Sequence, residues 1–386
     1  MKQILEELNP WWSADFKEVL IQRKKYVLKL QSFIDKKEVI ILTGMRRVGK
    51  TTLLKQTIQY LLQQNIQKEH ILFVSLDLLA LSDYSIYEIV QEYKSMHKID
   101  NSTKVYLFLD EVTYKPHFNQ ELKNLYDIGN YKIFASSSSA SALIDNQAFL
   151  TGRAKYLEIL PLTFEEFVTF KKYDFNKTSQ AILKGLFEDY MKEGGIPEFV
   201  LDNDTSYLSE LAEFIIEKDI ISKHGIKNKK VVYELYKLLC ERVGKQISYN
   251  NLAKLLSVDN ETISRYIQFF LETYLFYQIE VKDKLNVQIK SKKKLYCSDV
   301  GMRNVVTGFR DKGAIFENLV YTKLRDEYGK NINFLYKNGI EIDFLVKDII
   351  IEAKYGQELN EKQQKLFDSY KAKQKVIAQG FEFFTK

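Results

Sequence analysis

Short apolar runs alternate with amphipathic stretches along the first third of the chain. Four runs have the length and composition of buried strands: Val39–Leu42, Ile71–Leu76, Val105–Leu109 and Lys132–Ala135. Apolar residues at helical spacing predict helices around them: residues 13–36, a stretch ending near residue 64, 86–97 and 118–126. Strands that are apolar on both faces and separated by helices form parallel sheets covered on both sides. The first third therefore predicts an α/β domain.

The pattern changes after Pro161, where helical spacing dominates. It predicts three further helices: residues 163–170, 178–193 and 207–223. The segment Gly194-Gly195-Ile196-Pro197 interrupts them. Residues 247–272 predict two helices around a short turn, and residues 274–281 suit a strand. From residue 299 the alternation returns and predicts these elements: a helix at 313–328, strands near 332–336, 341–346 and 349–353, a helix at 361–373 and a strand at 376–379.

Length and composition favour several packed domains. The chain has 386 residues, more than the roughly 250–300 at which single cores stop growing. The changes of pattern divide it into four expected parts: residues 1–165, 166–230, 231–297 and 298–386. Hydrophobic residues make up 45% of the chain, which is ample for packed cores.

Charge and cysteine content limit the partners and the compartment. The net charge of +6 permits a nucleic-acid partner without requiring one. Two cysteines, Cys240 and Cys297, stand far apart in the sequence without metal-ligand spacing, so we expect reduced thiols and a cytoplasmic protein. Since no apolar run approaches the roughly 18–20 residues that span a bilayer, we expect no membrane partner.

A glycine-rich turn follows the first apolar run. It reads Gly44-x-x-x-x-Gly49-Lys50-Thr51-Thr52 and leads into a helical pattern. Backbone N–H groups in such a turn wrap nucleotide phosphates, the lysine reaches the β and γ phosphates, and the threonine hydroxyl ligates Mg²⁺. The positive end of the following helix favours the same anion. The turn predicts binding of a nucleoside triphosphate.

Two acids follow the third apolar run. Asp110 ends the strand expected at residues 105–109, and Glu111 comes directly after it. A carboxylate at this place can hold the Mg²⁺ shell, and the next one can polarise the attacking water. We therefore expect ATP and ADP as ligands, Mg²⁺ as cofactor and ATP hydrolysis as the activity.

The combined motifs resemble the AAA+ ATPases. They resemble more closely a bacterial and archaeal group in which this ATPase is fused to a helical segment and a C-terminal domain of uncharacterised function. The resemblance rests on these segments: Gly44–Thr52, Leu109–Glu111, Leu150–Arg153 with Leu160–Glu166, and Glu193–Glu198. It implies an ATPase core over residues 1–165 and a helical lid over 166–230.

The resemblance also implies roles for single residues. Ser136 or Ser137 would sense the γ-phosphate, since the family's polar strand end here reads Ala135-Ser-Ser-Ser-Ser139. Arg153 would contact phosphate in the same subunit or in a neighbouring one, which makes a homo-oligomer a candidate assembly; pairing with a nearby carboxylate is the alternative. Pro197 would pack near the adenine, unless it only breaks a helix. Two arginines within the turn would add positive charge beside the phosphates, with solvation as the alternative for at least one of them: Arg46 and Arg47.

Residues 247–272 resemble a winged helix-turn-helix, with the strand at 274–281 as part of the wing. That resemblance places four side chains at a DNA major groove: Thr262, Ser264, Arg265 and Gln268. Lysines near residues 223–230 and 290–294 fit phosphate contacts. Winged helices also serve as packing modules within ATPases, and lysine runs are often solvated faces. DNA and a protein are both candidate partners.

A second group of acids lies near the C-terminus. Residues alternate across a strand, so Glu352 and Lys354 project to one side and Asp343 lies on the neighbouring strand. Asp343 and Glu352 can then share a Mg²⁺ while Lys354 orients water, and Glu317 can complete the cluster. This arrangement resembles the restriction-endonuclease-like nucleases, although one carboxylate and one lysine also form an ordinary surface ion pair.

The expected fold is α/β: a P-loop NTPase parallel sheet with a helical lid, a winged helix-turn-helix segment and a C-terminal restriction-endonuclease-like α/β domain. Two hypotheses follow. In the first, the ATPase couples its nucleotide state to a nuclease-like module that acts on DNA. In the second, it is a nucleotide-dependent regulatory switch, and the nuclease-like fold is a scaffold for a protein or DNA partner.

Overall fold

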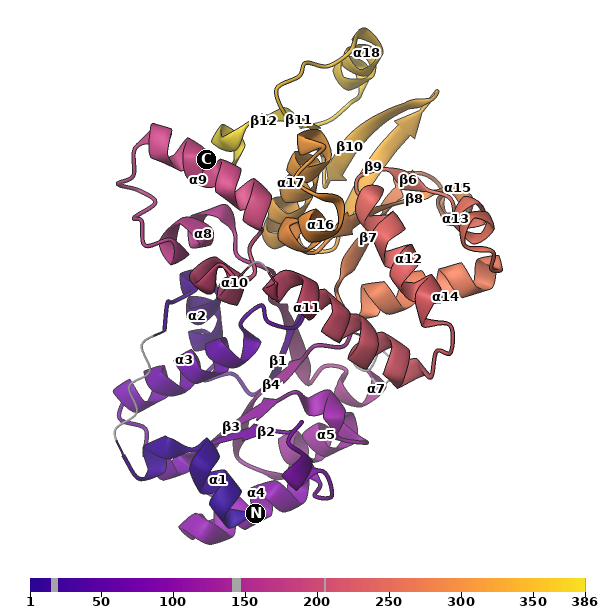
Figure 1. Cartoon of the computed structure of the whole chain (residues 1–386). Coiled ribbons are helices and arrows are strands. Elements are labelled where there is room, and N and C mark those ends of the chain that lie inside the picture. Colours follow the sequence, from indigo (N-terminus) through magenta and orange to yellow (C-terminus); the bar gives the residue numbers. More distant parts are fainter. Residues whose placement is uncertain (15–19, 141–146, 205, 386) are drawn as a thin grey trace. The chain divides into compact units, whose positions relative to one another are not determined.

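The computed structural model describes residues 1–14, 20–140, 147–204 and 206–385. The chain divides into two compact units, Met1–Ile159 and Leu160–Lys386 (Figure 1). The first unit ends within the span 1–165, for which an ATPase core is expected. The other three expected parts lie together in the second unit. Across the described residues, every helix is too short or too polar to cross a membrane.

The first unit is built on a parallel sheet with strand order β2-β3-β4-β1-β5. Its strands are β1 (Val39–Thr43), β2 (Ile71–Ser75), β3 (Val105–Asp110), β4 (Tyr131–Ser137) and β5 (Ala154–Glu158). Its helices are α1 (Lys2–Leu8), α2 (Lys24–Gln31), α3 (Lys50–Gln63), α4 (Ile86–His97), α5 (Phe118–Ile128) and α7 (Gln147–Leu150). The α/β prediction is confirmed, and this strand order is typical of P-loop proteins.

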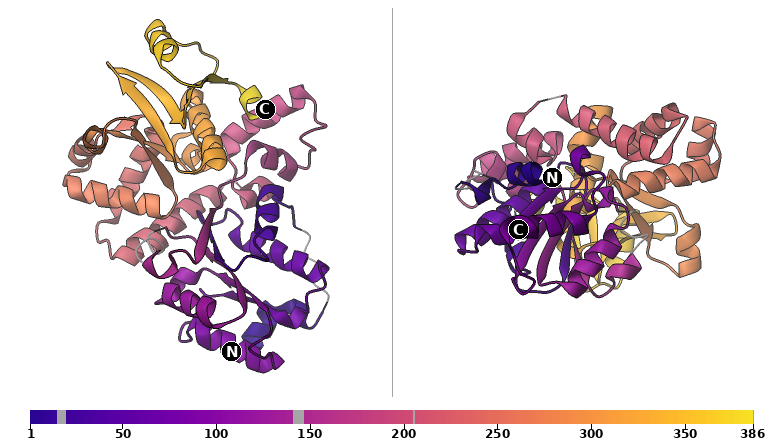
Figure 2. Two further views of the ribbon diagram at one scale, coloured as in Figure 1. Left: turned by 180° about the vertical axis from the view of Figure 1, so that it is seen from behind. Right: turned by 90° about the horizontal axis from the view of Figure 1, so that it is seen from below.

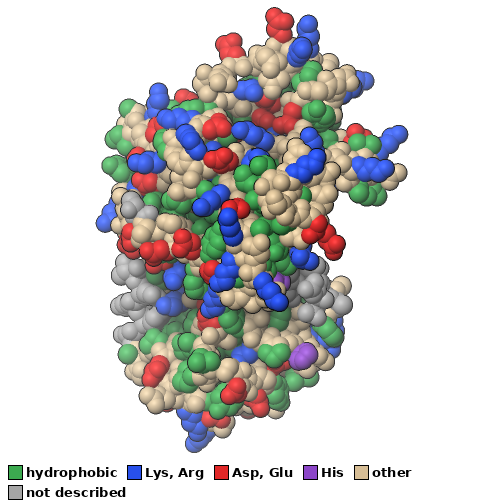
Figure 3. All heavy atoms as spheres, turned by 45° about the vertical axis from the view of Figure 1, so that its right-hand side comes forward, with side chains coloured by type: hydrophobic (Ala, Val, Ile, Leu, Met, Phe, Trp, Pro, Cys, Tyr) green, Lys and Arg blue, Asp and Glu red, His purple; other side chains and the backbone are tan. Residues whose placement is uncertain are grey.

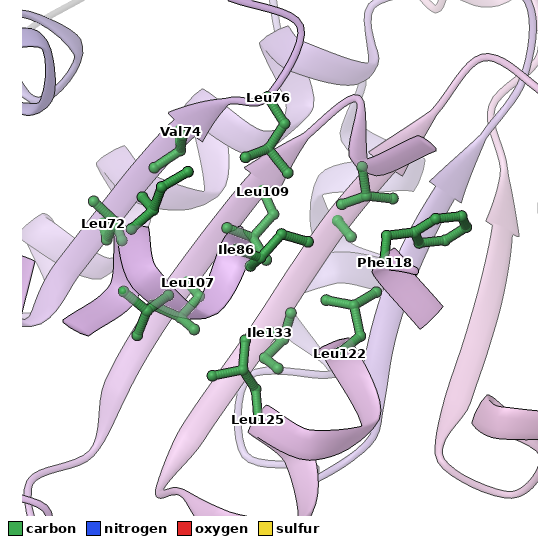
Figure 4. Packing of buried hydrophobic residues seen from close by; sticks show 14 of the residues in the cluster. Leu72, Val74, Leu76, Ile86, Leu107, Leu109, Phe118, Leu122, Leu125 and Ile133 are labelled. Atoms are coloured by element: carbon green, nitrogen blue, oxygen red, sulfur yellow. The ribbon is translucent and has the colours of Figure 1, made fainter. Parts of the chain in front are cut away.

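Helices cover both faces of this sheet (Figures 1 and 2). On one face, α1, α4 and α5 pack on the strands through a continuous apolar cluster that includes Leu5, Ile86, Leu107, Leu122 and Ile133. Figure 4 shows the strand residues of this cluster pointing at α4 and α5. The other face carries Phe108 on β3 and Phe134 on β4, which alternate along their strands with residues of the apolar cluster. Their rings stack with centroids 5.1 Å apart.

The N-terminal helix expected at residues 13–36 is wrong in its extent. Helix α2 covers Lys24–Gln31, and residues 20–23 are not helical; residues 15–19 of the expected helix lie outside the described residues. The reason is a competing set of contacts. The Ile21 carbonyl accepts from Gln56 on α3 at 3.0 Å, and Arg23 donates to the Val48 carbonyl at 2.9 Å. In a helix the Ile21 carbonyl would be paired internally, so it could not accept from Gln56.

The second unit is built on a mixed seven-stranded sheet of order β12-β11-β10-β9-β7-β8-β6. Its strands are β6 (Gln246–Ile247), β7 (Phe276–Val281), β8 (Lys293–Cys297), β9 (Ile332–Lys337), β10 (Ile340–Val346), β11 (Ile349–Lys354) and β12 (Gln374–Gln379). Strand β7 pairs with β8 on one side and with β9 on the other. The expected boundary between residues 297 and 298 therefore falls inside a single sheet.

Helices surround this second sheet. They are α8 (Phe164–Phe170), α9 (Gln180–Glu193), α10 (Pro197–Asp202), α11 (Tyr207–Phe214), α12 (Lys229–Glu241), α13 (Tyr249–Leu256), α14 (Asn260–Glu272), α15 (Leu285–Lys290), α16 (Val300–Thr307), α17 (Lys312–Tyr328) and α18 (Glu361–Ser369). A π-helical stretch, Ile215–Ser222, continues α11. Sequence patterning missed several elements of this unit, among them β8 and α16, which follow one another in the chain.

Helix α16 locks the end of α9 in place. Asp299, the N-cap of α16, accepts from the Gly195 N–H at 2.6 Å and from the Met302 N–H at 3.1 Å. Asn304 donates to two carbonyls in the last turn of α9, those of Met191 and Lys192, both at 2.9 Å. Because these carbonyls have no intrahelical partner, the amide acts as a C-terminal cap. The expected helical lid is thus tied to the C-terminal α/β region.

Candidate functional site

The glycine-rich turn has the geometry of a phosphate-binding loop. Gly44 has φ +140°, and a Cβ there would lie 2.3 Å from the Ile159 carbonyl oxygen, so only glycine fits. Gly49 has φ +93° and directly precedes α3, whose N-terminus the loop presents. Lys50 is buried, and its ammonium donates to the carbonyls of Gly44 and Met45 at 3.0 and 2.9 Å. The lysine is therefore folded over the loop that would hold the phosphates.

Thr51 and Asp110 meet at the carboxyl end of the sheet. The Thr51 hydroxyl donates to Asp110 Oδ2 at 2.7 Å, and the Ser136 hydroxyl donates to Oδ1 of the same carboxylate. Burial raises the pKa of Asp110, against the hydrogen bonds from Ser136 and Thr51, which lower it. A hydroxyl and a carboxylate side by side are suitable oxygen ligands for Mg²⁺. These two residues fit the ion that the motif implies.

Glu111 is held by the serine run at the end of β4. Its Oε2 accepts from the Ser138 hydroxyl at 2.9 Å and from the Ser138 N–H at 3.2 Å. Its own N–H donates to Ser136 Oγ at 2.9 Å, and its Oε1 lies 3.8 Å from the Lys50 ammonium. Of the two serines considered as sensor, Ser136 touches the acidic pair, whereas the Ser137 hydroxyl lies 3.3 Å from that of Thr113. Sequence reasoning missed Ser138, although the four-serine run pointed at this place.

The loop arginines are joined to other parts of the first unit. Arg46 donates to the Tyr114 hydroxyl at 2.9 Å, and Arg47 is exposed with φ +66°. Thr52 is half-buried in the first turn of α3. Arg23, which sequence reasoning did not select, supports the loop from below through the Val48 carbonyl. A role for Arg46, Arg47 and Thr52 at the nucleotide stays a prediction.

Arg153 lies at the opposite end of the sheet from the phosphate loop. Its carbonyl accepts from the N–H of Val39, the first residue of β1, whereas the loop follows the last residue of that strand. Five residues of strand separate them, roughly 16 Å. The guanidinium instead pairs with Asp127, at 3.0 and 3.5 Å. Contact with a phosphate in the same subunit is therefore wrong, and contact in a neighbouring subunit stays a prediction.

Pro197 occupies the first turn of α10 in the second unit, where a missing N–H costs nothing. The preceding glycines are fixed by Asp299: a Cβ on Gly194 would lie 2.3 Å from Asp299 Oδ1. Burial raises the pKa of Asp299 to about 6, against the N–H groups of Gly195, Met302 and Gly301. Packing of Pro197 near adenine stays a prediction.

The residues of the expected nuclease-like centre come from neighbouring strands and one helix. Asp343 on β10 and Glu352 on β11 are joined through the backbone: the Asp343 N–H donates to Glu352 Oε2 at 3.1 Å, and the Ala353 N–H donates to Asp343 Oδ2 at 3.0 Å. Glu352 Oε1 accepts from Lys354 at 2.9 Å and from Gln363 at 3.0 Å. The expected juxtaposition of Asp343, Glu352 and Lys354 is present.

A buried lysine that sequence reasoning placed among phosphate contacts lies in this centre. Lys294 on β8 is fully buried, and its ammonium lies 2.7 Å from Glu317, 2.8 Å from Glu341 and 3.2 Å from Asp343. The Tyr296 hydroxyl also donates to Glu317, at 2.7 Å. Lys294 belongs to a run of lysines in the sequence. Which of these lysines points into the unit is visible only once β8 is paired with β6 and β7.

A shared divalent ion does not fit this arrangement. Within the described part of the chain, no three His, Cys, Asp or Glu side chains are placed to hold a metal together. The oxygens of Asp343 and Glu352 already accept hydrogen bonds from the backbone and from Lys294, Lys354 and Gln363. The expectation that Glu317, Asp343 and Glu352 bind one metal is therefore wrong for this structure.

The electrostatics of the centre follow from burial. Burial and then the charge of Asp343 raise the pKa of Glu317 to about 8, against Lys294. Burial and Asp343 likewise raise the pKa of Glu352 to about 7, against Lys354. For Lys294, burial works against the charged form, but the surrounding carboxylates outweigh it and hold the pKa well above its usual range. Lys294 is therefore a permanent cation.

The helix-turn-helix expected at residues 247–272 is formed by α13 and α14. Along α14, Ser264, Arg265 and Gln268 are exposed and Thr262 is half-buried, while Ile263, Ile267 and Phe270 are buried. Of the neighbouring lysines, Lys294 is buried and others form ion pairs within the unit: Lys229 with Glu217, Lys230 with Glu234 and Lys293 with Glu280. On the face in Figure 3, acidic side chains lie among the basic ones.

Comparison with known proteins places the chain in a family. Residues 36–168 match the model of an AAA domain, and residues 184–313 match a domain of unknown function, DUF8612. The uncharacterized protein MJ1544 of Methanocaldococcus jannaschii is 31% identical over 331 residues, which cover 80% of this chain and 72% of that protein. The chain belongs to the same family as MJ1544.

Similarity to the MJ1544 family extends to bacteria and beyond the AAA domain. An uncharacterized protein of Haemophilus influenzae is 27% identical over 348 residues, covering 86% of this chain and 84% of that protein. A solved structure, the RuvB Holliday junction branch migration motor of Thermotoga maritima, is 16% identical and covers 67% of this chain and 89% of its own, with a TM-score of 0.33. The AAA domain implies nucleotide binding, typically with Mg²⁺.

Proposed function

We propose that the first unit is a Mg²⁺-dependent ATPase. The observation that carries the proposal is the contact of Thr51 with Asp110 at 2.7 Å, beside a phosphate loop whose lysine is already in place. The AAA domain match over residues 36–168 supports it independently. Bound with ATP, Mg²⁺ would neutralise charge on the β and γ phosphates.

The side chains have separate tasks in this proposal. Lys50 leaves the loop carbonyls for the phosphate oxygens and balances the charge that grows on them during transfer. Glu111 orients the attacking water and accepts its proton. It is the next residue in the chain after Asp110, the proposed Mg²⁺ ligand, and so lies beside the metal. Ser138 keeps Glu111 in position through two hydrogen bonds.

ATP turnover measured by phosphate release tests the proposal. Lys50→Ala should abolish nucleotide binding, and Glu111→Gln should keep binding and lower kcat by about 10²–10⁴-fold, as loss of a general base does. Glu92→Gln on α4, a residue that forms a 3.9 Å ion pair with Lys2, is the matched control and should remain active. Turnover by Glu111→Gln at the wild-type rate would refute the assignment.

We propose that the second unit carries the output, with a DNA-acting nuclease module as one candidate. The adjacency of Asp343, Glu352 and Lys354 on β10 and β11 favours it, as does the exposed face of α14. Incubation with ATP, Mg²⁺ or Mn²⁺ and several DNA forms tests it. Cleavage that persists in Glu352→Ala would exclude this centre as its source.

The second candidate is a nucleotide-dependent switch in which the second unit binds a protein or DNA partner without cleaving it. The filled centre around Lys294 favours this candidate. Lys50→Ala should then abolish partner binding, whereas Glu352→Ala should leave it intact. DNA binding, if electrostatic, must weaken as salt is added. The buried free thiols of Cys240 and Cys297 are consistent with the cytoplasmic location that we propose.

A further inference from the structure

The ammonium of Lys294 is surrounded by oxygens as a bound cation would be. It has three N–H donors and lies within 3.2 Å of three carboxylates, those of Glu317, Glu341 and Asp343. Each donor can therefore have a carboxyl oxygen of its own as acceptor, which is the condition under which a buried charge is stable. The side chains of these three acids converge on one point, and the lysine occupies that point.

We propose that Lys294 is the built-in cation of this centre, in place of a divalent metal, and that the C-terminal α/β region of this chain therefore binds no catalytic metal. Mg²⁺ or Ca²⁺ lies roughly 2.0–2.6 Å from its oxygen ligands. An ion at that distance from Glu317 and Asp343 would overlap the ammonium. The two cations exclude each other by space and by charge.

The surroundings of Lys294 fix its side chain. The rings of Tyr296, Phe334 and Phe344 lie within 6.0 Å of the ammonium, and the side chain is fully buried. An ammonium that left the carboxylates would enter this apolar region without acceptors, which costs far more than the same movement at a surface. A metal arriving from solvent therefore cannot displace the lysine as it would displace water.

The carboxylate of Glu352 also has hydrogen-bond partners without a metal. Glu352 accepts hydrogen bonds from Lys354, Gln363 and the Asp343 N–H, so both of its oxygens are engaged. Removing Lys294 would leave the carboxyl groups of Glu317, Glu341 and Asp343 facing one vacated point. A divalent ion at that point would have oxygen ligands from three acidic side chains.

Mn²⁺ binding to the full-length chain without nucleotide tests the inference, measured by electron paramagnetic resonance and by calorimetry. We expect wild type and Asp343→Asn to give the same titration, with no ion bound at this centre more tightly than about 1 mM. Lys294→Ala should gain one Mn²⁺ with a dissociation constant below roughly 10⁻⁴ M, and Lys294→Ala/Asp343→Asn should lose it. Lys293→Ala, the neighbour on β8 that pairs with Glu280 instead, is the matched control and should resemble wild type.

Two results would overturn the inference. One is a Mn²⁺ bound by wild type and lost in Asp343→Asn, which would place a metal in the centre beside the lysine. The other is a folded Lys294→Ala protein that gains no ion. If neither Lys294→Ala nor the longer Lys294→Met folds, the comparison of wild type with Asp343→Asn alone decides. Because no nucleotide takes part, failure here would leave the proposed ATPase untouched.

Discussion

Lys50 and Lys294 are both buried but have opposite surroundings, and the difference agrees with the separate roles that we propose for them. The Lys50 ammonium donates to two backbone carbonyls and lies 3.8 Å from one carboxylate, so phosphate oxygens can replace its present partners. The Lys294 ammonium already has three carboxylate partners, one for each of its N–H donors. Both residues stand in polar stretches of sequence. Motif spacing identifies the first, and only tertiary structure identifies the second.

Ser136 is the serine on which we expect turnover to depend. Its hydroxyl donates to Asp110, and it accepts from the Glu111 N–H, so it orients both acids. Ser136→Ala should lower kcat by about 10–100-fold and raise the Mg²⁺ concentration needed for half-maximal activity, as losses of outer-sphere partners do. Ser137→Ala is the control and should stay close to wild type. Equal losses in both variants would contradict the assignment.

Asp299 should give the fold a measurable pH dependence. Burial raises the pKa of Asp299 to about 6 in the folded chain, above its ordinary value of 3.8, so the folded state holds this proton more tightly than the unfolded state. The stability it contributes is present below pH 4 and is lost as pH rises through 6, by about 3 kcal/mol in total. Urea unfolding between pH 4 and 7 should show a smaller decline in Asp299→Asn than in wild type. An equal decline would contradict the role of this carboxyl.

Helices and strands whose apolar residues recur at regular spacing could be predicted from the sequence. Elements that depend on pairing with strands far away in the sequence could not. Helix α4 has the bounds that its apolar spacing predicts, Ile86–His97. Strand β5 was missed because this edge strand is exposed or half-buried along its length and carries polar residues between apolar ones. Strand β8 was missed because its run of lysines resembles a solvated segment, although its burial is complete from Lys294 onward.

Two glycines of α9 should respond oppositely to alanine. Gly185 lies in the exposed middle of the helix with open space around its Cβ position, so Gly185→Ala should stabilise the second unit by about 0.5–1 kcal/mol. Gly194 ends the helix with φ +77°, and its Cβ would meet Asp299, so Gly194→Ala should destabilise it. Thermal melts of the two variants check this. A higher melting temperature for Gly194→Ala would contradict the fixed helix end.

At the scale of the whole molecule, the phosphate loop lies close in the chain to the start of the second unit. The Ile159 N–H donates to the Thr43 carbonyl beside Gly44, and the chain enters the second unit at the next residue. Leu162 then donates to the Gly195 carbonyl at 2.7 Å, and the Gly195 N–H donates to Asp299. These hydrogen bonds and the chain between them form one continuous connection from the phosphate loop to Asp299, the N-cap of α16. No single motif in the sequence indicates it.

Assembly is the property that decides the role of Arg153. Since its own phosphate loop is roughly 16 Å away along β1, it can act on ATP only from a neighbouring subunit. Arg153→Ala should then lower ATP turnover by about 10³-fold or more, as loss of an arginine supplied in trans does. Lys123→Ala, which removes the other cation paired with Asp127, is the matched control and should remain active.

Mixing two inactive variants tests the trans arrangement directly. Glu111→Gln subunits still carry Arg153, and Arg153→Ala subunits still carry an intact Glu111. If Arg153 completes a neighbour's site, the mixture must recover part of the turnover that each variant lacks alone, and the recovery must grow with protein concentration because it depends on assembly. A mixture no more active than its components, or an Arg153→Ala protein with wild-type turnover, would show that Arg153 serves only its ion pair with Asp127.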